Sequence, residues 1–250
     1  MHRPLEGIRV LDLSRILAGP YAAQSLGDLG ANVTKIEAPW GDDTRGWGPP
    51  FQNGFDGDPV ASYFLSCNRA KDIHRGNIKE DRARIQSLMA NSDVVIENFR
   101  PGTFERYLGP IPKGIILCSI SGYGQDGPRR DEPAFDLTMQ ARSGIMSITG
   151  EAAGPPAKVG VAWIDVMTGM NAVSAILAAL YHKERTGEGA RIDISLWDTA
   201  IAALVNQGHN ALAGATPQRM GTAHPNLVPY RVFEASDGWF AIGVGSTGQW

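Results

Sequence analysis

The feature that most constrains the fold is the pattern at the start of the chain, in which a strand, a tight turn, a helix and a second strand follow one another. The apolar run Ile8–Leu13 predicts a short buried strand. Gly19 and Pro20 then open a helix that Gly30 closes, because proline is favoured in the first turn and glycine after the last. This order predicts a βαβ unit and hence a parallel sheet.

Short apolar runs and helical patterns continue to alternate along the chain. Five strands of one sheet are predicted: Ile8–Leu13, Asn32–Glu37, Asp93–Glu97, Gly114–Ser119 and Ala190–Leu196. A strand within Asp72–Lys79 is doubtful, because that segment alternates poorly and contains a glycine. We therefore expect an α/β fold, with a Rossmann-like parallel sheet and crossover helices but without the GxGxxG fingerprint.

The last third of the chain changes character. Apolar residues recur at helical spacing over Val161–Glu184, which predicts a long, largely buried helix, and a second helix is expected over Trp197–Ala213. From Tyr230 the pattern alternates around the turn Ser236–Gly238, as in a β-hairpin. We expect a large domain over residues 1–214, a linker over 215–228, and the incomplete beginning of a small α+β domain over 229–250.

Composition narrows the class of protein. The net charge is −3 and the isoelectric point about 6.0, which argues against a general nucleic-acid or anionic-membrane binder. Cys67 and Cys118 form no CxxC motif and have no paired histidines, so neither a disulfide framework nor a metal site is expected. With no targeting signal and no apolar run of about 18 residues or more, we expect a cytoplasmic protein, with mitochondria and peroxisomes as open alternatives.

The start of the first helix is a candidate anion site. Helices opened by Gly19-Pro20 leave backbone N–H groups and the positive end of the helix dipole at the top of the sheet. Many α/β domains open a helix in this way for structural reasons alone, so the signal needs support from elsewhere in the sequence.

That support comes from several motifs in a fixed order. They are Asp12–Pro20, Leu26–Ala31, Lys35–Glu37, Gly41–Arg45, Asn68–Lys71, Glu97–Gly102, Ser119–Pro128 and Arg185–Gly189. In this order the chain resembles the class III coenzyme A transferases of the CaiB/BaiF type, a family that includes acyl-CoA racemases. The turn Ser14–Pro20 and the segment His224–Tyr230 resemble the dicarboxylate, succinyl-CoA-dependent members.

The resemblance implies covalent catalysis by a carboxylate. An aspartate attacks the donor thioester, and the mixed anhydride and then an aspartyl-CoA thioester follow, which the acceptor acid resolves. The matching residue is Asp165, and Asp136 matches a carboxylate that helps to position the reacting groups. Both aspartates also fit helix N-caps, a role in which Asp165 would remain ionised at neutral pH.

Phe135 distinguishes two activities within the family. The racemases have a histidine at this position, opposite the aspartate that matches Asp165, because removing and returning a proton requires two bases. Phenylalanine cannot act as a base, so the sequence favours a transferase over a racemase or epimerase.

The resemblance also implies that coenzyme A binds as a thioester substrate, with a carboxylic acid as the second substrate and no tightly bound cofactor. Basic side chains at or beside the motifs would hold its phosphates, although each also fits an ordinary surface charge. The candidate residues for binding coenzyme A are Arg69, Lys71, Lys79, Arg100 and Arg106, the turn residues Ile16, Leu17 and Ala18, the loop residues Asn98 and Phe99, and Tyr123.

Family members continue well beyond the position that matches Trp250, so the chain has the pattern of a C-terminally truncated member. The family forms interlocked homodimers, and we expect a homodimer where the fold is complete. An alternative of another class is a catalytically inactive fragment that acts only by interaction, with exposed apolar surface as its hallmark.

Overall fold

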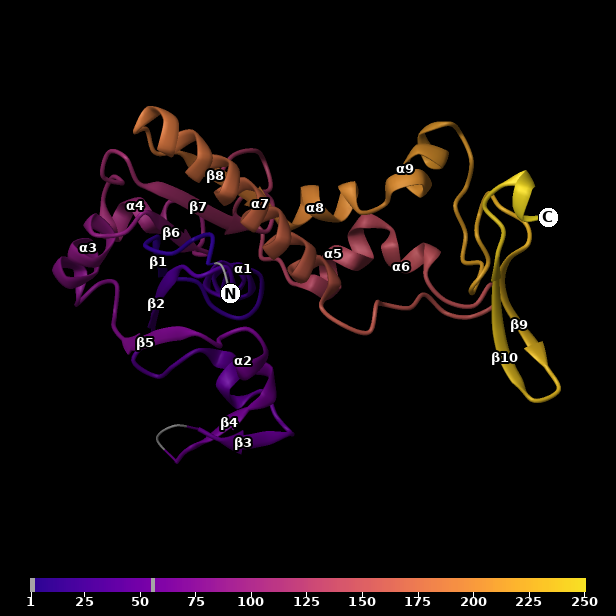
Figure 1. Ribbon diagram of the computed structural model, residues 1–250, viewed down its shortest axis with the longest axis horizontal. Coiled ribbons are helices and arrows are strands. Elements are labelled where there is room, and N and C mark those ends of the chain that lie inside the picture. The colour runs from indigo at the N-terminus through magenta and orange to yellow at the C-terminus, as the bar shows by residue number, and fades with distance from the viewer. Residues whose placement is uncertain (1–2, 55–56) are drawn as a thin grey trace. The chain divides into compact units, whose positions relative to one another are not determined.

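The computed structural model of the protein describes residues 3–54 and 57–250 (Figure 1). In chain order the elements are β1 (Arg9–Asp12), α1 (Ala18–Asp28), β2 (Asn32–Glu37), the 3-10 helix η1 (Asp43–Gly46), β3 (Phe51–Asn53), β4 (Pro59–Ala61), α2 (Ser62–Ser66), β5 (Lys71–Arg75), α3 (Arg82–Ala90), β6 (Val94–Glu97), α4 (Thr103–Leu108), β7 (Ile116–Ser121), α5 (Asp136–Ser143), α6 (Ile145–Ile148), α7 (Trp163–Thr186), β8 (Arg191–Ser195), α8 (Leu196–Ala202), α9 (Val205–Leu212), β9 (Tyr230–Ala235), β10 (Gly238–Gly243) and the 3-10 helix η2 (Thr247–Gln249).

The predicted α/β fold is confirmed. Six parallel strands form one sheet in the order β5-β2-β1-β6-β7-β8. Each of the five predicted strands is present, with ends that differ by one or two residues. Counting from β1, the strand order is that of a doubly wound sheet, in which the chain first builds outward on one side of β1 and then returns to build on the other.

The doubt about a strand near residue 72 was wrong. β5 pairs in parallel with β2, from Val33 opposite Lys71 to Glu37 opposite Arg75. It lies at the edge of the sheet and is only partly buried, so its side chains need not alternate cleanly between core and solvent. Gly76 follows the last residue of the strand and does not interrupt it.

Helices cover both faces of the sheet. On one face, alternate strand residues pack with α3 and α4 in a buried cluster of Leu11, Leu13, Ile36, Ile85, Met89, Val95, Phe104, Leu108, Ile115 and Leu117. On the other face α1 packs against α7, and these two helices contact β1, β2, β6, β7 and β8. Because side chains of a strand point alternately to the two faces, neighbouring residues of each central strand enter different layers of the core.

α7 is the long helix that the apolar spacing predicts. It is also long and apolar enough to cross a membrane, by length and composition alone, although a core helix of a soluble protein passes the same test. α7 packs against α1, β7 and β8, but the expectation that it is largely buried was wrong, because only 39% of its apolar stretch is buried within the described chain.

Two compact units can be distinguished: residues 1–136 with 163–199, and residues 137–162 with 200–250. The predicted boundary at residue 214 stays a prediction. The expected helix over Trp197–Ala213 is two shorter helices, because the chain turns at residues 203–204 and Val205 has a positive φ of 46°. No glycine or proline at those two positions signals the break.

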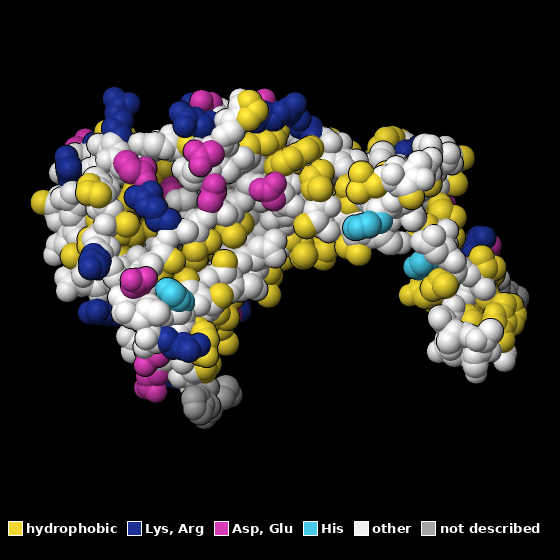
Figure 2. All heavy atoms as spheres, turned by 90° about the horizontal axis from the view of Figure 1, so that it is seen from above, with side chains coloured by type: hydrophobic (Ala, Val, Ile, Leu, Met, Phe, Trp, Pro, Cys, Tyr) yellow, Lys and Arg dark blue, Asp and Glu magenta, His cyan; other side chains and the backbone are white. Residues whose placement is uncertain are grey.

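The predicted hairpin is present as β9 and β10, which pair in antiparallel register. Its apolar side chains are largely exposed, including Trp239 at 72%, and Figure 2 shows hydrophobic side chains at the surface of this part of the chain. On the face drawn in Figure 2, basic and acidic side chains of the first unit are interspersed rather than gathered into one basic patch.

Candidate active site at the switch point of the sheet

The candidate site lies where the strand order reverses. β1 and β6 are neighbours, and the chain leaves them to helices on opposite faces of the sheet, which opens a crevice beyond their carboxyl ends. The turn 13–17 follows β1, and the loop 98–102 follows β6. Doubly wound sheets bind ligands at this position.

Asn98 joins the two connections across the crevice. Its side-chain oxygen accepts a hydrogen bond from the Arg15 backbone N–H at 3.0 Å, and its side-chain nitrogen donates to the Arg15 carbonyl at 2.8 Å. Both polar groups of one peptide residue are thereby satisfied by one amide side chain. Asn98 therefore fixes the separation of the two loops that form the site.

A small cavity of about 250 Å³ occupies this crevice. Seven of the predicted site residues line it: Ile16, Leu17, Ala18, Asn98, Phe99, Arg100 and Asp165. Phe135 lines it as well and is 63% exposed. The structure thus brings the predicted nucleophile together with the turn after β1 and the loop after β6.

Asp165 lies in the first turn of α7 and is half-buried. Burial, and secondly the negative charge of Asp136, raise the pKa of Asp165 to about 7. The sequence analysis expected a fully ionised N-cap at neutral pH, but the residue is the third of the helix and sits beside another carboxylate. At pH 7 its carboxyl is therefore about half ionised.

Asp136 caps the helix that carries Asp165. Its Oδ1 accepts hydrogen bonds from the backbone N–H groups of Ile164, at 2.7 Å, and Asp165, at 3.4 Å. These are the second and third residues of α7, the positions at which an N-cap side chain ordinarily bonds. Asp136 thus stabilises the start of α7 from a segment nearly thirty residues earlier, and it positions Asp165 through the backbone.

Tyr63 is a further residue of this region that the sequence analysis did not single out. Burial, and then the charges of Asp165, Cys67 and Asp136, raise the pKa of Tyr63 to about 12, so the phenol stays a neutral O–H donor. Its ring packs edge-on against Trp47, with ring centres 5.2 Å apart. Nothing in the local spacing around Ser62–Ser66 signals proximity to a carboxylate far along the chain.

A larger cavity of about 450 Å³ adjoins the same loops. Arg15, Asn98, Phe99 and Arg100 line both cavities, and Lys79 lines the larger one. Five cationic residues line one or both of these cavities, Arg15, Lys35, Lys79, Arg100 and Arg130, and Asp165 lines the smaller cavity.

The other predicted residues lie elsewhere. Among the described residues, the lining of neither cavity includes Arg69, Lys71, Arg106, Tyr123 or Asp136. Arg69 pairs with Asp28 on the surface, and the Arg106 guanidinium lies 5.4 Å from the ring centre of Tyr107. The ring of Tyr123 packs near Trp197, with centres 6.0 Å apart. Their predicted roles in binding coenzyme A stay predictions.

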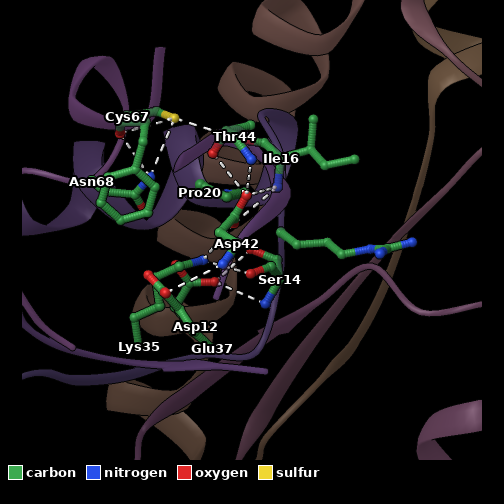
Figure 3. Close-up of polar contacts among 12 residues, drawn as sticks. Asp12, Ser14, Ile16, Pro20, Lys35, Glu37, Asp42, Thr44, Cys67 and Asn68 are labelled. Carbon is green, nitrogen blue, oxygen red and sulfur yellow. Dashed lines mark hydrogen bonds and ion pairs between the residues drawn. The ribbon is translucent and has the colours of Figure 1, made fainter. Parts of the chain in front are cut away.

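Lys71 is part of a buried ionic cluster with Asp12, Lys35 and Asp42. Figure 3 labels the last three of these residues. The Lys71 ammonium donates to the Asp12 carboxylate at 2.9 Å, and Lys35 lies 3.8 Å from the same carboxylate and 3.4 Å from that of Asp42. Burial favours the neutral acid, but the two ammonium groups hold the pKa of Asp12 below its usual range. The sequence analysis quoted the motifs that contain these residues without giving the side chains a role.

The turn between β1 and α1 is strained at Ile16. This β-branched residue has a positive φ of 71°, a conformation that costs a non-glycine residue about 1–3 kcal/mol. Leu17, the N-cap of α1, has no side-chain acceptor, so the first N–H groups of α1 have no side-chain cap where the helix meets the small cavity.

Glu97 ends β6 directly before Asn98. Its carboxylate accepts a hydrogen bond from the Phe99 N–H at 2.7 Å, and its side chain is 2% exposed. Burial raises the pKa of Glu97 to about 7, against the lowering effect of hydrogen bonds from Ser119 and Phe99.

Elsewhere, both cysteines are free and buried, and in the described part of the chain no group of three or more His, Cys, Asp and Glu could hold a metal ion.

Comparison with known proteins defines the class. A model described as CoA-transferase family III matches residues 5–250. A CaiB/BaiF family protein from Brucella suis has a crystal structure that superposes with a TM-score of 0.91 at 45% identity, covering 100% of this chain and 68% of that one. The chain belongs to CoA-transferase family III.

Individual relatives show which members of the family the chain is similar to. The chain is 47% identical to the succinate–glutarate CoA-transferase of Agrobacterium fabrum, over 98% of this chain and 64% of that protein. It is 43% identical to the human succinyl-CoA:glutarate CoA-transferase, over 99% of this chain and 58% of that protein. The chain thus spans roughly three fifths of the length of these curated relatives.

Proposed function

We propose that the protein is a CoA-transferase that moves coenzyme A from succinyl-CoA to a dicarboxylic acid, with Asp165 as the nucleophile. The observation that carries the proposal is the single cavity in which Asp165 meets the turn 16–18 and the loop 98–100. The names of the relatives, which include succinate–glutarate and succinyl-CoA:mesaconate CoA-transferases, support the choice of substrates.

The reaction proceeds by acyl exchange on one carboxylate. The Asp165 oxygen attacks the thioester carbonyl of succinyl-CoA, the C–S bond breaks, and coenzyme A leaves as a thiolate, giving a mixed anhydride. The thiolate then attacks the Asp165 carbonyl carbon and releases succinate, which leaves an aspartyl-CoA thioester. The acceptor carboxylate attacks this thioester, and the freed thiolate takes the acceptor acyl group from the second anhydride. Asp165 is regenerated with no net proton transfer.

The two cavities suit the two ends of the substrate. The small cavity holds the thioester beside Asp165, where backbone N–H groups at the start of α1 stabilise negative charge on the carbonyl oxygen. The larger cavity holds the nucleotide end, where Arg15, Lys79 and Arg100 offer charge-assisted hydrogen bonds to phosphate. A flexible pantetheine arm follows the shared lining of Asn98 and Phe99.

Phe135 supports transfer over racemisation. Its ring lines the small cavity with Asp165, where a second base would be required for inversion at an α-carbon. We expect a 2-methylacyl-CoA incubated with the protein in heavy water to keep its α-hydrogen. Deuterium incorporation would instead identify a racemase.

The working protein is, in our proposal, a cytoplasmic homodimer. Large apolar side chains of the hairpin, among them Trp239, Phe240 and Ile242, are exposed in the described chain, as expected for a surface that packs against further protein. Sedimentation velocity measures the state of association directly. A monomer at micromolar concentration would contradict the proposed dimer.

The nucleophile is tested by trapping the intermediate. The protein is incubated with succinyl-CoA, quenched with hydroxylamine and analysed by intact mass and peptide mapping. Hydroxylamine attacks an activated Asp165 carbonyl and leaves a hydroxamate there, whereas Asp165→Asn gives none. Asp198→Asn, which removes an exposed carboxylate from the first turn of α8, serves as the control and keeps the adduct. A folded protein with no adduct from succinyl-CoA or other donors would indicate the inactive alternative.

A further inference from the structure

The connection between β1 and α1 is held by side chains from other parts of the chain, and the geometry of these contacts assigns a role to a residue that lines the larger cavity and not the small one beside Asp165. We propose that Asp42, supported by Lys35, is a positioning residue that fixes the strained turn 14–18 beside Asp165. Its effect on reaction rate rests on the proposed function, while its effect on the turn itself does not.

Ile16 is the residue that needs to be held. Its positive φ of 71° is unfavourable for a β-branched side chain, so the isolated turn would relax to another conformation. The next two residues, Leu17 and Ala18, line the small cavity with Asp165. A relaxed Ile16 would therefore redirect the backbone that faces the reacting carboxylate.

Asp42 supplies the restraint at this residue. Its two carboxylate oxygens lie 3.2 and 3.4 Å from the Ile16 backbone nitrogen and accept its N–H. The same carboxylate accepts from the N–H and hydroxyl of Thr44, at 3.1 and 2.7 Å, which caps the short helix η1. Figure 3 shows these contacts reaching Asp42 from Ile16 and from Thr44.

Lys35 holds both Asp42 and the turn. It is fully buried on β2, with its ammonium 3.4 Å from the Asp42 carboxylate, and it donates to the Ser14 carbonyl at 2.6 Å. Three successive residues of the turn are thus anchored by side chains from different elements: Ser14 by Lys35, Arg15 by Asn98, and Ile16 by Asp42.

A role in fixing the geometry of the turn 14–18 explains the buried cluster of Asp42 and Lys35 better than a role in stabilising the folded protein. Buried ion pairs contribute little net stability, because removing charges from water offsets most of their attraction. They are nevertheless costly to break and hold their partners at fixed distances. All the contacts of Asp42 and Lys35 described above end on the turn, on η1 or on Asp12, so the cluster ties the turn to the sheet beneath it.

Hydrogen exchange tests the restraint on the full chain without any substrate. In Asp42→Ala we expect amide exchange over residues 14–18 to rise at least about tenfold, while β1 keeps its protection. Asp42→Asn retains an acceptor oxygen for the Ile16 N–H and should restore most of the protection. Thr44→Val removes a different hydrogen bond of the same carboxylate and should leave the turn unchanged. Unchanged exchange over 14–18 in Asp42→Ala would overturn the proposal.

Adduct formation at Asp165 tests the consequence for rate. In Asp42→Ala we expect the rate constant for adduct formation to fall at least about tenfold, with the succinyl-CoA concentration for half-maximal rate changing much less. A role in stability alone would lower the fraction of protein that reacts and leave the rate constant unchanged, and that result would refute positioning. If the parent protein forms no adduct, the proposed function fails, and the exchange experiment still decides the role of Asp42.

Discussion

Replacing Glu97 by glutamine is expected to stabilise the protein at alkaline pH and to have little effect at acidic pH. Glu97 is buried at the end of β6, and burial raises its pKa from 4.5 to about 7. The folded protein therefore holds a proton that the unfolded chain releases between these two values. Stability falls as pH rises through this window, because the folded state binds more protons than the unfolded state.

The size of the effect follows from the shift. At about 1.4 kcal/mol for each pKa unit, a rise from 4.5 to about 7 corresponds to about 3 kcal/mol of stability lost between pH 4.5 and pH 8. Glutamine carries no ionisable proton, and its side-chain oxygen can still accept the Phe99 N–H. Glu97→Gln should therefore match the parent protein near pH 4.5 and exceed its free energy of unfolding by about 3 kcal/mol at pH 8.

Urea unfolding followed by circular dichroism at pH 5 and pH 8 measures the difference. Glu6→Gln, which removes an exposed carboxylate of the same kind, is the control and should give the same change at both pH values. The reasoning is refuted if Glu97→Gln differs from the parent by an equal amount at pH 5 and pH 8.

Three other predictions concern the site. The rate of hydroxamate formation should rise with pH through about 7, because only ionised Asp165 attacks. Asp136→Asn should move this rise to lower pH by removing a nearby negative charge. A pH profile that Asp136→Asn leaves unmoved would contradict this prediction. Lys35→Met leaves the Asp42 carboxylate without its cation and should cost about 3–5 kcal/mol in urea unfolding. Arg69→Ala, which breaks an exposed pair, should leave the urea midpoint almost unchanged in the same assay.

The sheet could be predicted because its central strands carry strong local signals. β6 and β7 are short apolar runs between turn residues, and such runs are buried on both faces in parallel sheets. β1 and β2 place fewer apolar residues among polar ones. β5 was doubted because an edge strand is exposed on one side, so tertiary pairing with β2 decides its conformation and the local pattern does not. The break before Val205 has no glycine or proline at the two turn positions to signal it.

The site could be predicted only where its chemistry is local. The Gly-Pro helix start and the Asn98–Arg100 loop are each a short continuous segment of the sequence. The resemblance to the class III coenzyme A transferases pointed to Asp165. The role of Asp136 as the cap of α7 depends on a contact between segments far apart in the chain. The buried cluster around Lys35 could not be read from the sequence, because a lysine on a strand is ordinarily exposed.

The hydrogen bond from Ile164 to Asp136 has a consequence for how this chain can tolerate changes in length. The chain leaves the first compact unit after Asp136 and returns to it at Trp163, so the bond closes the base of the excursion 137–162. Insertions or deletions within the excursion, which contains most of α5 and all of α6, would lengthen or shorten a segment whose two ends stay tied together. The position of Asp165 is thereby insulated from changes in that segment, which leaves it free to vary while the nucleophile stays in place.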